Sequence, residues 1–534
     1  MAIMLGMLLA FYAVVVGILY LTKQKSQPTF DEYSVGGRSY GTWFVAMSYV
    51  NSWWPGSTFI AFFGLAAGAG VFGMYALAYS TLGVAFMYLM ATRAWRWGKV
   101  YDLRTQPDLL RVRYGSQAVR VIASIIGVVS LFPWVVLGMQ ALGELFEIAS
   151  GGAWSVVASL IVGLVVILIR QIWTVQMGMR GLIMTDMFQG IVAYGVSSLV
   201  GIIMLTGAFG SPISWGDLAS VSDKFLAMPG DGGSYGPWYI FALIFTGVIG
   251  SLCWPTSFQR IYTASSVRTV KKGTLATIVI SATFYTILML VGIAAVSIPE
   301  VVTDPQSAWF TIMDQFGGTW MLGLAVVIVF AAQMGHTDAS VQVAGLQVSN
   351  DIIATIRRRP LSDHQLTVIA KTSMVIYMLL AAAIAFLTFN FDRLQLLAQI
   401  SYQGIIQLSV PLFLGIFWRG GNRHGAIWGM VSGFVIAGVL TLVFPDDISA
   451  LGSITGGIVG LAVNLGVFLI VSALTGHSAD ERARVEEMFR VAARVPSDSA
   501  EPTAAQHDPA HPSSTGDIEQ VVEPRKPVGA GEAG

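Results

Sequence analysis

Two short stretches decide the fold: SWWPGSTF at residues 52–59 and SLCWPTSF at residues 251–258. Each places a Trp-Pro pair among Ser and Thr near the middle of a long apolar segment. Proline lacks an amide hydrogen and clashes with the preceding helical turn, so we expect each helix to open there and to free backbone carbonyls. Kinking prolines also occur as purely structural features of membrane helices, and this alternative applies to either pair taken alone.

The composition around these stretches is that of an all-α integral membrane protein. Of 534 residues, 55% are hydrophobic and 11% are charged, whereas soluble domains carry roughly 25% charged residues. The single cysteine excludes an intramolecular disulfide, and the zero net charge gives no indication of nucleic-acid binding. Apolar stretches of spanning length recur about 13 times, near residues 2–21, 41–66, 71–95, 118–148, 152–170, 177–207, 237–263, 274–298, 319–349, 367–389, 394–417, 425–444 and 451–475.

The distribution of Lys and Arg predicts the topology, because cytoplasmic connections collect positive charge. Alternate connections between the spans, numbered here in chain order, contain most of the basic residues: Lys23, Lys25, Arg38, Arg93, Arg96, Lys99, Arg104, Arg111, Arg113, Arg170, Arg180, Arg260, Arg268, Lys271, Lys272, 357–359, Arg419 and Arg423. We therefore predict a multi-pass protein of the plasma membrane, the inner membrane in a bacterium, with its N-terminus outside and its C-terminus in the cytoplasm.

The two Trp-Pro spans are five spans apart and, in this topology, cross the membrane in opposite directions. That is the relation expected of an inverted five-helix repeat, in which broken helices flank the transport sites. The predicted parts are a first span and linker (1–40), a first repeat (41–207), an external loop (208–236), a second repeat (237–418), two further spans (419–476) and a cytoplasmic, largely disordered tail (477–534). The start of that tail has the pattern of a short amphipathic helix.

Asp186 lies within span 6, where an ionisable side chain is costly enough to indicate a function. An ion pair with Arg180 is the structural alternative. Polar and small residues also follow one face of span 9 at helical spacing: Gln333, His336 or Thr337, Ser340, Ala344 and Gln347. This face either lines a cation pathway or forms hydrogen bonds between helices. Asp338 lies around the helix from it, so we expect Asp338 and His336 to belong to separate sites.

The chain resembles the sodium:solute symporter family over residues 1–476. The similarity is carried by VGGRSYGTWFVAMS (35–48), TQPDLLRVRYGS (105–116), the Thr-Asp of LIMTDMFQG (182–190), FQRIYTASS (258–266), AAQMGHTDAS (331–340) and GIFWRGGNRHGAIWGMVSG (415–433), where Gly420 replaces a usual basic residue. The resemblance implies a LeuT-like inverted-repeat core and secondary active transport by alternating access, with a solute and a coupling cation as partners. It implies neither an enzyme nor any cofactor other than the coupling ion.

The resemblance also implies a sodium site between spans 2 and 9. Its ligands would be the backbone carbonyls of Asn51, Trp54 and Ala332, with Asp186 nearby, and Asp338 matches the family's usual aspartate. The two hydroxyl ligands, however, fall on Gly335 and His336.

Sodium prefers oxygen ligands, as calcium and magnesium do, and neither glycine nor imidazole supplies a side-chain oxygen. Sodium coupling is therefore one prediction. Proton-coupled or sodium-independent transport, with a protonated His336 beside Asp186 in place of the ion, is the other.

By the same resemblance, the solute site lies beside both breaks. Its candidate residues are Trp53, Ser57 and Thr58 in span 2, Trp254 and Pro255 in span 7, and Tyr402 and Gln403 in span 11. Opened helix ends can bind a carboxylate, and no buried arginine clamp is evident, so we expect a small carboxylate or amino acid. A membrane module that senses solute without transport is the alternative from another class. The sequence predicts no oligomeric state.

Overall fold

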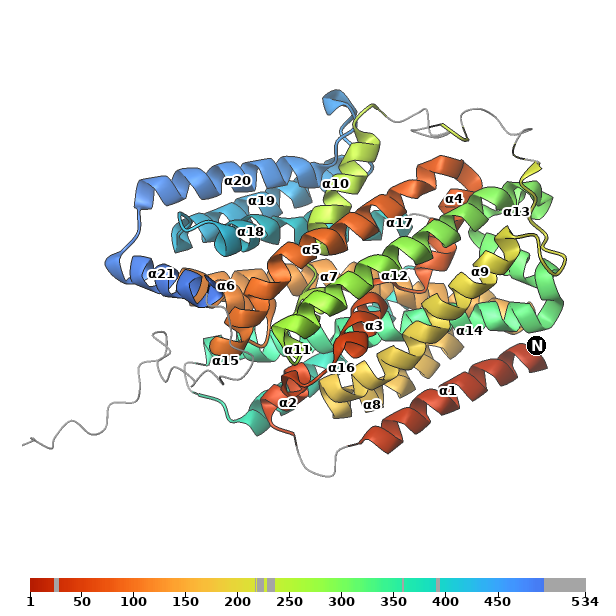
Figure 1. The fold of residues 1–534 in the computed structure, drawn as a ribbon, viewed down its shortest axis with the longest axis horizontal. Helices are drawn as coiled ribbons and strands as arrows, with labels where there is room; N and C mark the ends of the chain where they lie inside the picture. Colours follow the sequence, from red (N-terminus) through yellow and green to blue (C-terminus); the bar gives the residue numbers. More distant parts are fainter. Residues whose placement is uncertain are drawn as a thin grey trace, which may run out of the picture. The chain divides into compact units, whose positions relative to one another are not determined.

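The computed structural model describes residues 1–23, 28–216, 218, 225–227, 236–357, 360–389 and 394–493, which are helical and contain no β-strand (Figure 1). The helices are α1 (Ala2–Thr22), α2 (Phe30–Val35), α3 (Thr42–Trp53), α4 (Phe63–Ala69), α5 (Tyr75–Val100), α6 (Gln106–Tyr114), α7 (Gln117–Ala149), α8 (Val156–Gly190), α9 (Ser197–Leu205), α10 (Tyr239–Ser251), α11 (Pro255–Thr263), α12 (Val267–Ala294), α13 (Pro299–Thr303), α14 (Ala308–Leu346), α15 (Ala354–Ile356), α16 (Asp363–Leu387), α17 (Leu394–Ile405), α18 (Ser409–Phe417), α19 (Arg423–Val443), α20 (Gly456–Thr475) and α21 (Ala479–Ala493).

The described residues contain 11 helical stretches that are long and apolar enough to cross a membrane. Two of them, Thr58–Val100 and Val156–Leu205, fold back on themselves. The tilted rings of Phe62 and Tyr79 have centroids 6.2 Å apart, and Arg170 donates to Thr185 at 3.4 Å. In a straight helix, 15 residues span about 22 Å. Each of these two stretches contains parts of two predicted spans, 41–66 with 71–95 and 152–170 with 177–207, which accounts for the difference between the 11 stretches and the about 13 predicted spans.

Glycines in left-handed or otherwise strained conformations make these reversals. Gly70, between α4 and α5, has φ +62°, and Gly178, inside α8, has φ +61° and ψ −146°. Side chains on other residues disfavour such angles strongly. The carbonyl oxygen of Tyr33 also lies 2.6 Å from the position of a Cβ on Gly178. Gly178 therefore allows both the turn and the close contact with α2.

Both predicted helix breaks are present and fall at the tryptophan before each proline. Trp54 has φ −99° and ψ +107° and ends α3, and Trp254 has φ −61° and ψ +120° and separates α10 from α11. A proline disfavours helical angles at the residue before it, which explains the extended backbone angles of both tryptophans. Helix α3 ends directly before Trp54, whereas α10 already ends at Ser251. After the first break the chain resumes as a π-helical segment, Thr58–Phe62, that leads into α4.

The two broken helices run in opposite directions. Tyr40, two residues before α3, pairs with Ala264, the residue directly after α11. The amide of Tyr40 donates to the carbonyl of Thr263 at 3.2 Å, and the amide of Ser265 donates to the carbonyl of Tyr40 at 3.1 Å. The start of one broken helix thus lies against the end of the other, as an inverted repeat requires.

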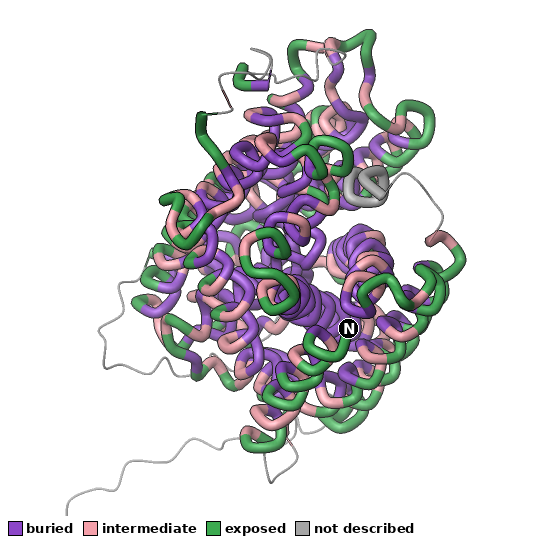
Figure 2. The backbone as a smooth tube through the Cα atoms, turned by 90° about the vertical axis from the view of Figure 1, so that its right-hand side faces the viewer, coloured by how far each residue is buried: buried purple, intermediate pink, exposed green. Residues whose placement is uncertain are grey.

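The remaining helices surround this pair. α1 buries one stripe, Met4, Leu8, Phe11, Val15 and Leu19, and Figure 2 shows exposed residues along the outer sides of the helices. Helix α21, at the start of the predicted tail, packs on α5, where Trp97 donates to the carbonyl of Met488 at 2.7 Å. Residues 494–534 of the predicted tail and most of the predicted loop 208–236 lie outside the described residues.

Candidate functional site

A buried carboxylate, Asp186, occupies the centre of the predicted cation site. It is fully buried and receives hydrogen bonds from the hydroxyl of Ser48 and from Asn51 Nδ2 at 2.7 Å. Arg260 Nη2 lies 3.6 Å from its Oδ2 atom. The alternative pairing with Arg180 is not formed, because Arg180 donates to the carbonyl of Thr22 at 3.0 Å instead. The charge of Asp186 is therefore balanced by groups of the protein itself.

Arg260 is fully buried on α11, six residues after Trp254 at the second helix break. Its Nε donates to Ser48 Oγ at 3.1 Å, and its Nη1 donates to the carbonyl of Thr256 at 3.3 Å. The expectation that Arg260 lies in a cytoplasmic connection is therefore wrong. A buried charge needs a partner of opposite charge. The presence of Asp186 within a predicted span was therefore the signal in the sequence that a basic residue lies close to it.

Asn51 and Gly335 share one small space between α3 and α14. A Cβ on Gly335 would overlap the carboxamide of Asn51, so residue 335 cannot carry a side chain while Asn51 holds this position. Asn51 Nδ2 bridges Asp186 and Gln189, with the second bond at 3.1 Å. The structure thus places an amide donor, instead of a hydroxyl acceptor, next to the carboxylate.

His336 binds the broken end of α3 instead of Asp186. Its Nδ1 lies 3.0 Å from the carbonyl oxygen of Ser52, and its ring packs edge-on against Trp134 with centroids 6.4 Å apart. Within the described residues its Nε2 is buried without a hydrogen-bond partner. The predicted arrangement of His336 beside Asp186 is therefore replaced by a contact with a carbonyl of the helix break.

Of the other backbone carbonyls predicted to bind sodium, that of Trp54 already accepts a hydrogen bond from the protein. The carbonyl of Trp54 accepts a hydrogen bond from the hydroxyl of Tyr194 at 2.6 Å. Ala332 is fully buried on α14. Gln333, on the predicted polar face of that helix, accepts from the amide of Gly56 at 3.1 Å and so ties α14 to the chain just after the first break.

Asp338 belongs to a second, separate ion pair, as expected from its place on the helix. Arg170 Nη2 donates to it at 2.7 Å, and Gln171 Nε2 donates to it at 2.6 Å. Arg170 is fully buried, so the expectation that it lies in a cytoplasmic connection is wrong. Since Arg170 also donates to Thr185, the two ion pairs flank the Thr185-Asp186 dipeptide.

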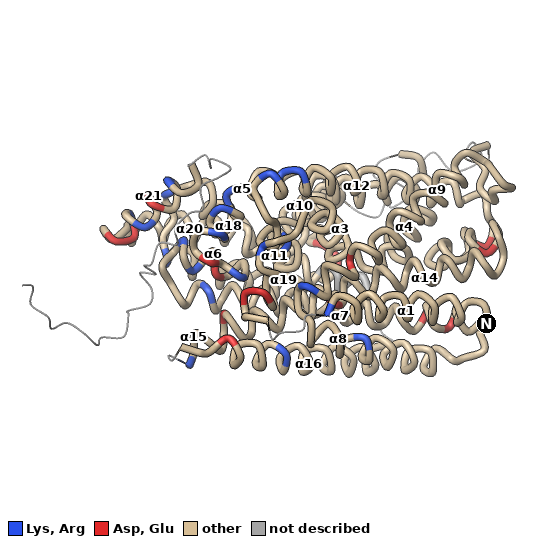
Figure 3. Tube along the Cα trace, turned by 60° about the horizontal axis from the view of Figure 1, so that its bottom comes forward, with Lys and Arg blue, Asp and Glu red and all other residues tan. Residues whose placement is uncertain are grey.

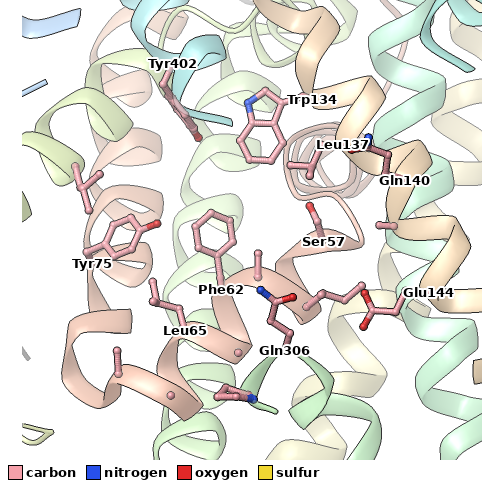
Figure 4. Close-up of a pocket in the computed structure, with 18 of the residues that line it drawn as sticks. Ser57, Phe62, Leu65, Tyr75, Trp134, Leu137, Gln140, Glu144, Gln306 and Tyr402 are labelled. Atoms are coloured by element: carbon pink, nitrogen blue, oxygen red, sulfur yellow. The ribbon is translucent and has the colours of Figure 1, made fainter. Parts of the chain in front are cut away.

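A cavity of about 590 Å³ begins at the first helix break, and Figure 4 shows Ser57 directed into it. Three of the predicted solute residues line it: Ser57, Tyr402 and Gln403. Three others, Trp53, Thr58 and Trp254, line a neighbouring space of about 20 Å³ that Tyr402 shares. Pro255 lines neither of them.

Gln403 is mainly structural, because its Oε1 accepts hydrogen bonds from the amide of Gly457 at 2.9 Å and from the hydroxyl of Thr441. The sequence did not point to several cavity residues, namely Phe62 in the first broken helix, Tyr75 on α5, and Trp134, Gln140 and Glu144 on α7. The spacing of Trp134, Leu137, Ala141 and Glu144 along α7 was the available signal, because it places them on one helix face.

Comparison with known proteins agrees with this architecture. The profile of the sodium:solute symporter family matches residues 33–433. The chain belongs to the sodium:solute symporter family. Relatives of this family member include an uncharacterized symporter of Bacillus subtilis, YodF, which is 22% identical over 499 residues and aligns with 91% of this chain and 96% of the relative. A monocarboxylate transport permease of Rhizobium johnstonii is 24% identical, and the alignment covers 85% of this chain and 92% of the relative. A sodium/proline symporter of Staphylococcus aureus is also 24% identical, and the alignment covers 88% of this chain and 92% of the relative.

Solved structures show the same fold. A substrate-bound, outward-open sodium-coupled sialic acid symporter matches this family member with a TM-score of 0.73 at 16% identity, over 88% of this chain and 97% of that structure. The transporter Mhp1 matches with a TM-score of 0.52 at 15% identity, over 87% and 99%. The protein is therefore a multi-pass membrane transporter of the LeuT fold and not an enzyme.

Proposed function

We propose that this protein is a secondary active transporter that moves a small carboxylate or amino acid across the cell membrane by alternating access. The observation that carries the proposal is the cavity of about 590 Å³, which begins at the first helix break. Its lining combines Ser57 from the break with Trp134 from α7 and Tyr402 from α17, so helices of both repeats enclose one space. A site shared by the two halves is what rocking of one half against the other would expose to each side in turn.

The cavity extends from the breaks toward the end of the bundle that holds the N-terminus. Glu147 lines it, and Gly151, just beyond the end of α7, lies close to Met1. Lys and Arg gather mainly toward the opposite end, near α6, α15 and α21 (Figure 3). By the positive-inside rule, this distribution supports an external N-terminus, a cytoplasmic C-terminus and a cavity that admits solute from outside.

Coupling to sodium remains a prediction, and the geometry supports the sodium-independent alternative. Sodium requires a shell of oxygen ligands. Between α3 and α14, the carboxamide of Asn51 fills the space above Gly335, and the hydroxyl of Tyr194 and the imidazole of His336 bind the carbonyls of Trp54 and Ser52. Arg260 supplies the positive charge beside Asp186. We therefore infer that protein groups take the place of the ion at this pair of helices.

Reconstituted vesicles test the transport proposal. Purified protein would be assayed for uptake of labelled amino acids and short carboxylates under an inward sodium gradient, an inward proton gradient and no gradient. Ser57→Trp fills the cavity at the break and should reduce uptake to background, whereas Leu82→Trp, on an exposed face of α5, should retain it. Binding of solute without uptake under any gradient would instead favour a sensing module.

A further inference from the structure

One face of α7 gives the cavity an unusual set of polar groups. Trp134, Leu137, Gln140, Glu144 and Glu147 all line the cavity and recur at three- and four-residue spacing, so they share a helix face. Figure 4 shows Gln140 and Glu144 on this wall, across from Tyr75 and beyond Trp134. The wall therefore changes from aromatic near the break to carboxylate and carboxamide farther along.

Gln140 presents a hydrogen-bond acceptor to the cavity. Its Nε2 donates to the carbonyl and the hydroxyl of Thr388, at 3.0 and 2.9 Å, and these bonds fix which end of the carboxamide is the amide nitrogen. Its Oε1 is buried without a partner among the described residues, and the side chain is 8% exposed. A buried carbonyl oxygen without a hydrogen bond lowers the stability of the protein. A hydrogen bond from a bound molecule to Gln140 Oε1 would therefore be favourable.

The charged side chains on this wall of the cavity are all acidic. Glu144 and Glu147 line it, and the described lining residues include no Lys, Arg or His. For Glu144, the described part of the chain provides no ion pair. A carboxylate on the wall of a largely apolar cavity repels an anion and attracts a cation more strongly than it would in bulk water.

The aromatic part of the cavity is also suited to a cationic ligand. Trp134 and Tyr402 lie edge to face with ring centroids 5.9 Å apart, and Phe62, Tyr75 and Tyr79 complete the lining near the break. Aromatic faces bind cationic nitrogen as well as apolar carbon. Ser57 Oγ, at the break, is buried without a partner among the described residues and can donate a hydrogen bond to a second polar group of the ligand.

The geometry points to a solute that carries a cationic amino group, which binds Gln140 Oε1 and the carboxylate of Glu144, while Ser57 binds its carboxylate or other acceptor. This inference rests on the proposed transport function and narrows it, because it selects amino acids and other amines over carboxylates that lack an amine. Glu144 is a binding residue in this assignment, and the charge of the wall excludes simple anions.

The test uses matched sets of three small molecules: an amino acid, the carboxylate that lacks its amine and the amine that lacks its carboxylate. Proline, cyclopentanecarboxylate and pyrrolidine form one set, and the other amino acids supply further sets. Binding to the full-length protein is measured by the rise of its thermal midpoint, and uptake is measured in vesicles. We expect amine-bearing members to bind and the amine-free carboxylates to fail.

Variants separate this inference from the transport proposal. Glu144→Gln should weaken binding of the amine-bearing ligand by about 10- to 100-fold, the worth of one charge-assisted hydrogen bond, and Glu144→Lys should shift the preference to the amine-free carboxylate. Asp314→Asn, an exposed acid on α14, should change neither. Transport of an amine-free carboxylate that is unaffected by Glu144→Gln would overturn this inference and leave the transport proposal intact. Failure of every set to bind would overturn both.

Discussion

The carboxamide of Asn51 fills the space above Gly335, where a side chain on residue 335 would have to lie. The same carboxamide donates to Asp186 at 2.7 Å. The glycine and the asparagine therefore depend on each other, although they are far apart in the chain. The neighbouring contact between Ser52 and His336 likewise joins residues 284 positions apart. Together they place an amide donor next to the carboxylate at the predicted position of the coupling ion.

Gly335→Ser should displace Asn51 from Asp186. The loss of one hydrogen bond to a charged group and the overpacking of this site should each lower the free energy of unfolding by about 1–3 kcal/mol. The thermal midpoint of the purified protein and its solute uptake measure this effect. Gly438→Ser is the matched control, because a Cβ on Gly438 meets no atom within 4 Å. A Gly335→Ser protein as stable as wild type would contradict the shared space.

A second substitution at this pair should compensate. Asn51→Ser vacates the space that the new side chain of Gly335→Ser would need, so the double variant should regain part of the lost stability. Its two hydroxyls supply oxygen atoms in place of an amide, and oxygen ligands are what sodium requires. We expect the double variant, unlike wild type, to show a thermal midpoint that rises in sodium chloride relative to choline chloride. If the loss of stability in the double variant equalled the sum of the losses in the two single variants, the two residues would not be coupled.

Asp186→Asn should leave Arg260 buried without a negative partner. Breaking a buried pair by removing one partner costs about 3–5 kcal/mol, so the thermal midpoint should fall and the yield of folded protein should decrease. Arg260→Gln combined with Asp186→Asn removes both charges and should recover much of that loss. A double-mutant cycle on the midpoints measures the coupling, and a coupling near zero would contradict the ion pair.

Gly178→Ala should prevent correct folding at the turn inside α8. The backbone angles of Gly178, φ +61° and ψ −146°, are nearly restricted to glycine, and the new methyl group would lie 2.6 Å from the carbonyl oxygen of Tyr33. Size-exclusion chromatography of the detergent-solubilised variant should show aggregation in place of a symmetric peak. Gly195→Ala, where the nearest atom is 3.9 Å away, should elute as wild type does.

The stability contributed by Asp108, on the short helix α6 outside the membrane spans, should depend on pH. Burial by itself would raise the pKa of its carboxyl, but Arg120 and Arg111 outweigh burial and hold this pKa below 3.8. Arg120 Nη2 lies 2.6 Å from its Oδ1 atom. Because the folded-state pKa is depressed, the contribution is complete above the unfolded value of about 3.9 and disappears as pH falls through the folded value.

The thermal midpoint of wild type minus that of Asp108→Asn should therefore be constant from about pH 7 to pH 5 and shrink toward zero below about pH 4. Asp314→Asn, at an exposed acid on α14, is the matched control for the exchange of a carboxylate for an amide. A difference between wild type and Asp108→Asn that grows on acidification would contradict the sign of the pKa shift.

The sequence predicted the parts of this structure that depend on local chemistry. The Trp-Pro pairs predicted the helix breaks at Trp54 and Trp254, because proline acts on the residue directly before it. Hydrophobic length and the alternation of charge predicted the spans. The partners of the buried charges were not predictable in this way. Arg170 and Asp338 are 168 positions apart, and their pairing depends on helix rotation and packing, which no local pattern encodes.

The cavity wall on α7 illustrates the same limit. Its residues have the spacing of one helix face, but the sequence of a membrane helix does not distinguish a face toward a cavity from a face toward another helix. Gln140 and Glu144 became candidates only when the structure placed them on the same cavity as Ser57 and Tyr402. In contrast, Asp186 was identifiable from sequence, because a carboxylate inside a span is costly wherever the helix faces.

The response of the wild-type protein to sodium is the measurement that decides whether Asn51 and Arg260 replace the coupling ion. The thermal midpoint of purified protein would be compared in sodium chloride and choline chloride at equal ionic strength, because a ligand that binds only the folded state raises it. We predict the same midpoint in both salts. A sodium-specific rise in wild type that Asp186→Asn abolishes would contradict this assignment and would restore sodium as the ion beside Asp186.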